Sequence, residues 1–183
     1  MKQITNLLFE ARMLKDLVRS GYAFLGSGKE SIAEHSFTMA FICLVMAKLD
    51  QDIDGLKLVA MALVHDLHEA RTGDFNYVQK KYSDVDEAKA ISHLIKDLPF
   101  GNDIRLLTDE FNMGETKEAK LARDADQISF ILELKKLKDT GAQSPEKWLP
   151  VILDRLKTQT GIQMAQSIME TQWDEWWMND YSE

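Results

Sequence analysis

Helix-breaking residues are scarce in this sequence, and that scarcity constrains its fold more than any other feature. The 183-residue chain has three prolines, and residues 29–98 contain only two glycines, Gly55 and Gly73. Proline and glycine are the residues least favourable inside a helix, so long helices are allowed through most of the chain. No alternating run of β-branched residues is long enough to predict a sheet. We therefore expect an all-α fold, a compact helical bundle in which residues 1–183 form a single domain.

Apolar periodicity and capping residues place the helices approximately. Ser31 and Glu34 have the spacing of a capping box, which marks a helix start. The helix that follows is apolar nearly all round, so we expect it at the centre of the bundle. Ser144 and Pro145 have the order preferred at another helix start. The predicted helices cover residues 2–19, 31–49, 54–69, 84–98, 102–111, 115–138, a segment beginning at 145, and 160–181.

Composition and charge argue against several classes of protein. The formal net charge of -8 argues against sequence-independent binding to polymeric nucleic acid, which needs a basic surface. It does not exclude a small phosphate ester, because a bound metal can reverse the field locally.

The single cysteine, Cys43, allows no intrachain disulfide. The longest apolar run, Met39–Ala47, is too short for a bilayer span of about 20 residues, and residues 1–10 lack a signal-peptide pattern. We expect a cytoplasmic protein with no membrane partner.

Metal-binding residue types are concentrated directly after a strongly apolar helix. The segment 65–74 contains His65, Asp66, His68, Glu69 and Asp74. Imidazole nitrogen and carboxylate oxygen together suit borderline and hard divalent cations. A further histidine, His35, lies on the first turn of the predicted central helix. One His-Asp pair alone is weak, since a histidine beside apolar residues is usually hydrogen-bonded core, but the combination favours a metal site.

Two aspartates lie inside the longest predicted helix, among apolar residues. A buried carboxylate is costly unless it is paired or bound to a metal, so Asp124 and Asp126 each need a partner. They are two residues apart, which is about 200° around a helix, and they cannot both face one site. Periodicity alone does not choose between them, because neither sits at the centre of the apolar stripe.

Four short motifs carry a resemblance to a known family. They are Arg19-Ser20-Gly21-Tyr22, then Glu30-Ser31-Ile32-Ala33-Glu34-His35-Ser36, then His65-Asp66 followed by Glu69 and Gly73-Asp74, then Ala125-Asp126-Gln127. In this order and at these separations they resemble the HD superfamily of metal-dependent phosphohydrolases, most closely its 5'-deoxynucleotidase branch. The resemblance implies an HD-type helical bundle with the metal-site core over about residues 30–140. The C-terminal helices, 144–181, would pack on that core.

The same resemblance implies a role for each motif residue. It places His35, His65, Asp66 and Asp126 on a divalent metal cation, which could be Mn, Co, Mg, Fe, Ni or Zn, and leaves Asp124 as the fallback. It also puts Glu69 and Asp74 in the catalytic site, and Arg19 and Tyr22 against the substrate. Glu69 would orient the attacking water, assist proton transfer or bind a second ion, and Asp74 would meet a sugar hydroxyl or that second ion.

The function implied by the resemblance is removal of the 5'-phosphate from (deoxy)nucleoside monophosphates by a metal-activated water, in a homodimer. The alternatives are hydrolysis of another small ester, such as a cyclic phosphodiester or a guanosine polyphosphate, and a non-catalytic nucleotide-sensing module. For single residues, Arg19 could instead stabilise the end of the first helix, and Tyr22 could pack under its loop. Tyr22 also stands where the family usually has tryptophan, so substrate preference can differ.

Overall fold

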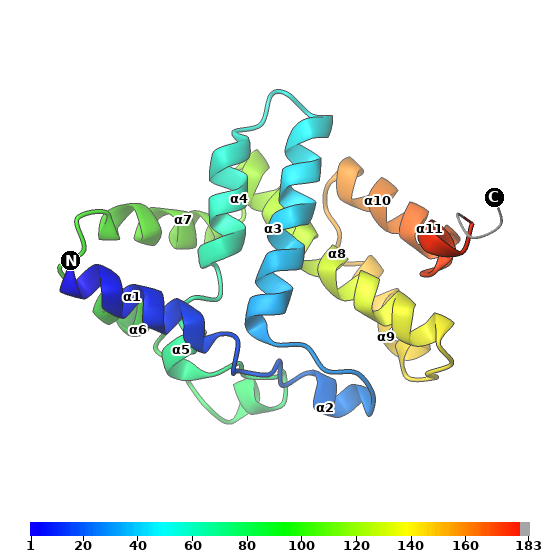
Figure 1. Cartoon of the computed structure of the whole chain (residues 1–183), viewed down its shortest axis with the longest axis horizontal. Coiled ribbons are helices and arrows are strands. Elements are labelled where there is room, and N and C mark those ends of the chain that lie inside the picture. The colour runs from blue at the N-terminus through cyan, green and yellow to red at the C-terminus, as the bar shows by residue number, and fades with distance from the viewer. Residues whose placement is uncertain (180–183) are drawn as a thin grey trace.

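The computed structural model describes residues 1–179 and consists of helices joined by short connections (Figure 1). Within these residues there is no strand, only an isolated antiparallel bridge between Val18 and Ser31. The all-α prediction is therefore confirmed. The helices are α1 Lys2–Met13, α2 Tyr22–Leu25, α3 Ile32–Leu49, α4 Gly55–Val64, α5 Glu69–Thr72, the 3-10 turn η1 Gln79–Lys81, α6 Glu87–Leu94, α7 Gly101–Met113, α8 Lys117–Asp139, α9 Pro145–Leu153, α10 Gln159–Glu170 and α11 Glu175–Met178.

Helix α3 lies at the middle of the molecule and packs against both α4 and α8 (Figure 1). Its start is fixed by a capping box, as the sequence predicted: the Glu34 backbone N–H donates to Ser31 Oγ at 3.2 Å, and the Ser31 backbone N–H donates to Glu34 Oε2 at 2.6 Å. These bonds satisfy helix N–H groups that have no partner within the helix. The cap thereby fixes the position of the first turn, which carries His35.

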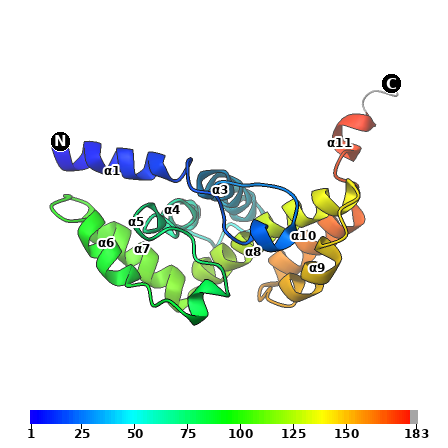
Figure 2. The ribbon, with the colours of Figure 1, turned by 90° about the horizontal axis from the view of Figure 1, so that it is seen from below.

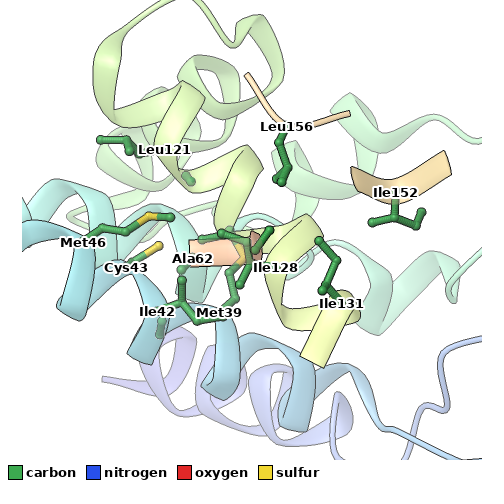
Figure 3. Close-up of a cluster of buried hydrophobic side chains, with 14 of the residues drawn as sticks. Met39, Ile42, Cys43, Met46, Ala62, Leu121, Ile128, Ile131, Ile152 and Leu156 are labelled. Atoms are coloured by element: carbon green, nitrogen blue, oxygen red, sulfur yellow. The ribbon is translucent and has the colours of Figure 1, made fainter. Parts of the chain in front are cut away.

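The main hydrophobic core fills the space where α3, α4 and α8 meet (Figure 3). Met39, Met46, Ala62, Ile128 and Ile131 are fully buried there. By length and composition alone α3 could cross a membrane, but these buried residues make it the core helix of the bundle. The C-terminal helices α9 and α10 and the connection between them extend the same core along α8. Their buried residues are Leu149, Ile152, Leu156 and Ala165.

A second, smaller core lies on the other side of the central helices, near α1, α6 and α7 (Figure 2). Its buried residues are Leu14, Ile32, Leu67, Ile91, Leu94, Ile95 and Ile104. Ile32 at the start of α3 and Leu67 just after α4 belong to this cluster, whereas the middle of both helices belongs to the first. The ends of α3 and α4 that carry the histidines therefore lie between two packed cores, which hold them in place.

Three predicted helices end earlier than expected, each for a local reason. The first stops at Met13, because the chain that follows pairs with the segment before α3: the Arg19 N–H donates to Glu30 O at 2.9 Å, and the Ile32 N–H to Leu17 O at 3.0 Å. The third ends at Val64 and continues as tight turns into α5. The last is divided into α10 and α11 by an extended residue, Thr171, and its predicted residues 180–181 lie outside the described part of the chain.

Candidate metal centre

Three helices bring four of the predicted site residues together. His35 comes from the first turn of α3, His65 and Asp66 from the turn directly after α4, and Asp126 from the middle of α8. His35 Nε2 lies 3.1 Å from Asp126 Oδ1 and 3.9 Å from Asp66 Oδ2, and His65 Nε2 lies 3.0 Å from Asp66 Oδ2. Ligand atoms of His35, His65 and Asp126 all lie within 4.8 Å of one another.

The orientation of the His65 ring shows that this cluster fits a cation. His65 Nδ1 lies 2.9 Å from the carbonyl oxygen of Ala62, which can only accept a hydrogen bond, so Nδ1 carries the proton. The other nitrogen, Nε2, points at the carboxylates; burial opposes the charged ring, but the adjacent Asp66 raises the pKa of His65. Within residues 1–179, the Nε2 atoms of His35 and His65 are buried without a hydrogen-bond partner. A divalent cation between these nitrogens and the carboxylates would take the place of a proton there, with Nε2 as the ligand atom.

The second nitrogen of His35 is also held by a neighbour. Nδ1 lies 2.8 Å from Ser129 Oγ, and that hydroxyl donates to the backbone carbonyl of Asp126 at 2.9 Å. Arg19 Nη1 also lies 2.8 Å from Nδ1, so Ser129 and Arg19 together hold this side of the ring and leave Nε2 facing the carboxylates. Groups that contact the other nitrogen of a metal-binding histidine fix the orientation of its ring.

The carboxylates of the cluster are held in their charged form. Burial acts to raise the pKa of Asp66, but the opposing attraction of His65, His35 and Arg19 lowers that pKa well below its usual range. Burial also acts to raise the pKa of Asp126, but the contact to His35 outweighs it, and the pKa of Asp126 is lowered. Two ionised carboxylates, about a quarter exposed at 23% and 25%, give the centre the negative charge that a cation requires.

Glu69 lies at the start of α5, beside the cluster but without a partner of its own. Its carboxyl group makes no hydrogen bond or ion pair to any residue that the structure describes. Burial and the nearby carboxylates of Asp66 and Asp74 raise the pKa of Glu69 to about 9. Asp74 is tied down instead, since its Oδ2 accepts bonds from the Ser20 N–H at 2.6 Å and the Ser20 hydroxyl at 3.2 Å. That pairing fixes the Arg19-Ser20 segment next to the centre.

Arg19 points into the centre, whereas Tyr22 does not. Arg19 Nη1 lies 2.8 Å from His35 Nδ1 and 3.2 Å from Glu30 Oε2, and its guanidinium group sits 5.6 Å from the centre of the Phe130 ring. Tyr22 is only 6% exposed, and its hydroxyl donates to Glu30 at 3.3 Å. This burial favours the alternative in which Tyr22 packs under its loop, and a place for Tyr22 against the substrate stays a prediction. Tyr22 packs under its loop and supports Glu30, which in turn holds Arg19.

Asp124 faces away from the centre and has a different task. It is 1% exposed and accepts hydrogen bonds from the Lys157 N–H at 2.9 Å, the Thr158 N–H at 2.7 Å and the Thr158 hydroxyl at 2.6 Å. Because its oxygens are satisfied in this way, Asp124 anchors the start of α10 to α8. Asp124 does not face the histidines. The structure therefore decides which aspartate faces the centre, a choice that helical periodicity alone did not make.

Known proteins are similar to this chain in sequence and in fold. The HD domain family matches residues 11–168. The chain belongs to the HD domain family. Among curated relatives, it is 33% identical over 132 residues to the 5'-deoxynucleotidase HDDC2 of Dictyostelium discoideum, a match that covers 66% of this chain and 70% of that protein. It is 29% identical over 132 residues to the Bos taurus protein of the same name, covering 69% of this chain and 63% of that protein.

The fold is also shared with a solved structure. The PH0347 protein of Pyrococcus horikoshii superposes with a TM-score of 0.75 at 30% identity, covering 91% of this chain and 98% of that one. These findings confirm the predicted membership of the HD superfamily and its 5'-deoxynucleotidase branch. As a member of this family the chain is a metal-dependent phosphohydrolase, and its centre offers the histidine and aspartate ligands that such a protein needs.

Several residues of this HD domain matter to the centre but were not assigned a role from the sequence. Ser129 orients His35, Glu30 and Phe130 hold Arg19, and Phe111 of α7 packs 5.1 Å from the His65 ring. Only Ser129 left a weak signal, because a residue three positions after a ligand lies on the same side of a helix. The others come from separate elements, and nothing in the local sequence links them to the histidines.

Proposed function

We propose that the protein removes the 5'-phosphate from deoxynucleoside monophosphates, releasing a nucleoside and inorganic phosphate. The observation that carries this proposal is the convergence of His35, His65, Asp66 and Asp126 from three separate helices. The 5'-deoxynucleotidase name of the relatives supports the choice of substrate. A divalent cation, when bound there, would lower the pKa of water and offset charge on the phosphoryl group.

The residues around the centre would divide the remaining work. Arg19 engages its neighbours through Nη1, and no bond from Nη2 or Nε reaches another described residue. The N–H groups of Nη2 and Nε in the planar guanidinium can therefore donate to two phosphate oxygens. Glu69, with a pKa raised to about 9, holds its proton near neutral pH and would assist proton transfer by donating it to the leaving oxygen. Asp74 would position Ser20 and, through it, Arg19.

The test is phosphate release from a panel of 5'-deoxynucleotides, 5'-ribonucleotides, a cyclic dinucleotide and a guanosine polyphosphate, each with Mn²⁺, Co²⁺ and Mg²⁺. We expect release from the 5'-deoxynucleotides and its loss when the metal is chelated. Release only from the cyclic or guanosine compound would favour a different small ester as substrate. No release from any compound with any metal would favour a non-catalytic nucleotide-sensing module.

We also propose that the protein is a homodimer that pairs through the outer face of α3. The exposed residues of this helix before Leu49 follow a 3-4 spacing on one side, and the three at the centre are apolar. Phe37, Phe41 and Leu44 are 71%, 58% and 44% exposed. A contiguous apolar stripe of this kind is typical of an interaction surface. The complete stripe is Glu34, Phe37, Phe41, Leu44 and Lys48.

The charges at the two ends of this stripe favour a second copy of the same chain as the partner. Phe41 lies midway between Glu34 and Lys48. If two α3 helices pack antiparallel about Phe41, Glu34 of each copy faces Lys48 of the other, and a two-fold interface is self-complementary in this way. Sedimentation should show a dimer that Phe41→Asp converts to a monomer. Leu106→Asp, at another exposed apolar residue on α7, should leave the dimer intact. A Phe41→Asp protein that remains dimeric contradicts this interface.

A further inference from the structure

A basic groove runs along α8 and ends at the metal centre. Its volume is about 770 Å³, which lies in the range of small-molecule sites. Phe111 and Gly114 at the end of α7 form one side, and α8 forms the floor. The connection between α9 and α10 forms the opposite side. Asp126, which faces His35, is one of its lining residues, so the groove is continuous with the centre.

Four cationic side chains line this groove from two walls. Lys120 and Arg123 come from α8, and Arg155 and Lys157 from the connection between α9 and α10. None of the four forms an ion pair with a carboxylate of the described residues. The chain as a whole carries a net charge of -8, so this grouping of unpaired cations does not follow from a generally basic composition. It gives one concave surface the opposite sign to the rest of the protein.

The acidic residues of the groove do not cancel these charges. Asp124 accepts its hydrogen bonds from the N–H groups of Lys157 and Thr158 and from the Thr158 hydroxyl. Asp126 faces His35 at the inner end. Only Asp154 remains as an acidic lining residue without another partner. The lining therefore carries four cations and three carboxylates, a formal balance of +1.

Both walls are fixed by the fold, which makes the groove a preformed site. The Arg123 guanidinium lies against Gly114, the left-handed residue that ends α7 at φ +66, and a side chain at Gly114 would collide with it. The opposite wall is attached to α8 because the backbone N–H groups of Lys157 and Thr158 donate hydrogen bonds to the Asp124 carboxylate. Little ordering is then needed when a ligand binds, and that favours affinity.

We propose that this groove binds a phosphate group other than the one that is cleaved. Arginine and lysine placed on two walls suit the several oxygens of a phosphate group. A group held beside Asp126 would lie next to the centre, either as an outer phosphate of a nucleoside polyphosphate or as free inorganic phosphate. Lys120 and Arg123 are one helical turn apart, so successive phosphates of a chain could each meet a cation.

The proposal is tested by calorimetric binding of two probes, inorganic phosphate and α,β-methylene-dATP, whose α,β bridge cannot be hydrolysed. The proteins compared are the unmutated chain, Arg123→Gln/Arg155→Gln, and the control Lys96→Gln, which changes an exposed lysine after α6 outside the groove. We expect the double variant to bind at least one probe about tenfold more weakly, as for the loss of charged hydrogen bonds. The control should stay within about twofold. Because both replaced side chains are exposed, unchanged thermal unfolding should confirm intact folding.

Each outcome decides the matter. Weaker binding of the methylene analogue alone identifies a polyphosphate chain as the ligand, and weaker binding of both probes includes free phosphate. Equal affinity of the unmutated and double-variant proteins for both probes, or an equal effect of Lys96→Gln, overturns the proposal. Repeating the comparison in His65→Ala separates it from the proposed hydrolysis, because the groove cations remain when the catalytic centre is disabled. A retained difference there upholds the groove even if no phosphomonoester is hydrolysed.

Discussion

Two carboxylates on different faces of α8, those of Asp124 and Asp126, have contrasting surroundings. On the face toward α9 and α10, Asp124 has its oxygens filled by N–H and hydroxyl donors and is 1% exposed. On the face toward α3, the Asp126 side chain is 25% exposed and lies beside histidine nitrogens that have no hydrogen-bond partner in residues 1–179. A satisfied carboxylate stabilises the fold, whereas ring nitrogens without a hydrogen-bond partner beside charged carboxylates are suited to binding a cation.

The largest expected effect comes from removing a ligand on the α3 face. Asp126→Asn and His65→Ala should each lose bound metal and lower phosphatase activity by at least about 100-fold, since even partners of metal ligands are worth up to that factor. Metal analysis and activity assays on folded protein would measure both. Asp124→Asn is the matched control, because it alters the carboxylate two residues away. If Asp124→Asn lost metal and Asp126→Asn kept it, the assignment of the two faces would be reversed.

The next effect is a loss of stability, and it concerns Asp124 on the face of α8 toward α9 and α10. Asp124→Ala leaves the N–H groups of Lys157 and Thr158 buried without an acceptor, which should lower the free energy of unfolding by about 3 kcal/mol. Urea unfolding would measure this change. The metal content of the protein that remains folded should be unaltered, because Asp124 contacts no residue of the centre. A loss of metal in parallel with stability would mean that the two faces are coupled.

A smaller effect is expected at Ser129, which orients His35 from within α8. Ser129→Ala should weaken metal affinity by about tenfold while the fold persists, because it removes a hydrogen-bond partner that orients the His35 ring but no ligand atom. Competition with a chelator would report the affinity. Ser36→Ala is the control, since Ser36 is also buried but its hydroxyl donates only to Ile32 O at 2.9 Å. Equal affinities of the two variants would show that Ser129 does not orient the ring.

The remaining effect is the pH dependence of the metal-free protein. The pKa of Glu69 is raised to about 9 from an ordinary value of 4.5, so the folded state binds this proton more tightly than the unfolded state. Its contribution to stability is complete below pH 4.5 and is lost as the pH rises through about 9. The melting temperature should therefore fall more over that range in the unmutated protein than in Glu69→Gln. Parallel curves for the two proteins would show that Glu69 is not titrating there.

Much of the local structure could be predicted from the sequence because it depends on neighbouring residues. The capping box of Ser31 and Glu34 fixes the start of α3 through bonds within one turn. The third helix was predicted too long because its apolar pattern continues into the turn that carries His65 and Asp66. The burial of Tyr22 could not be predicted locally, because it depends on Phe130 and Glu30, which come from other parts of the chain.

The sequence by itself determined a helical chain, the ends of its central helix and the residue types of a metal site. Only the tertiary structure decided which aspartate faces the histidines, that His65 Nε2 points at the Asp66 carboxylate, and that cations from α8 and from the connection between α9 and α10 share one groove. The physical reason is that helix propensity and capping act over a few residues. The face that a helix turns inward is decided by packing against elements far away in the chain.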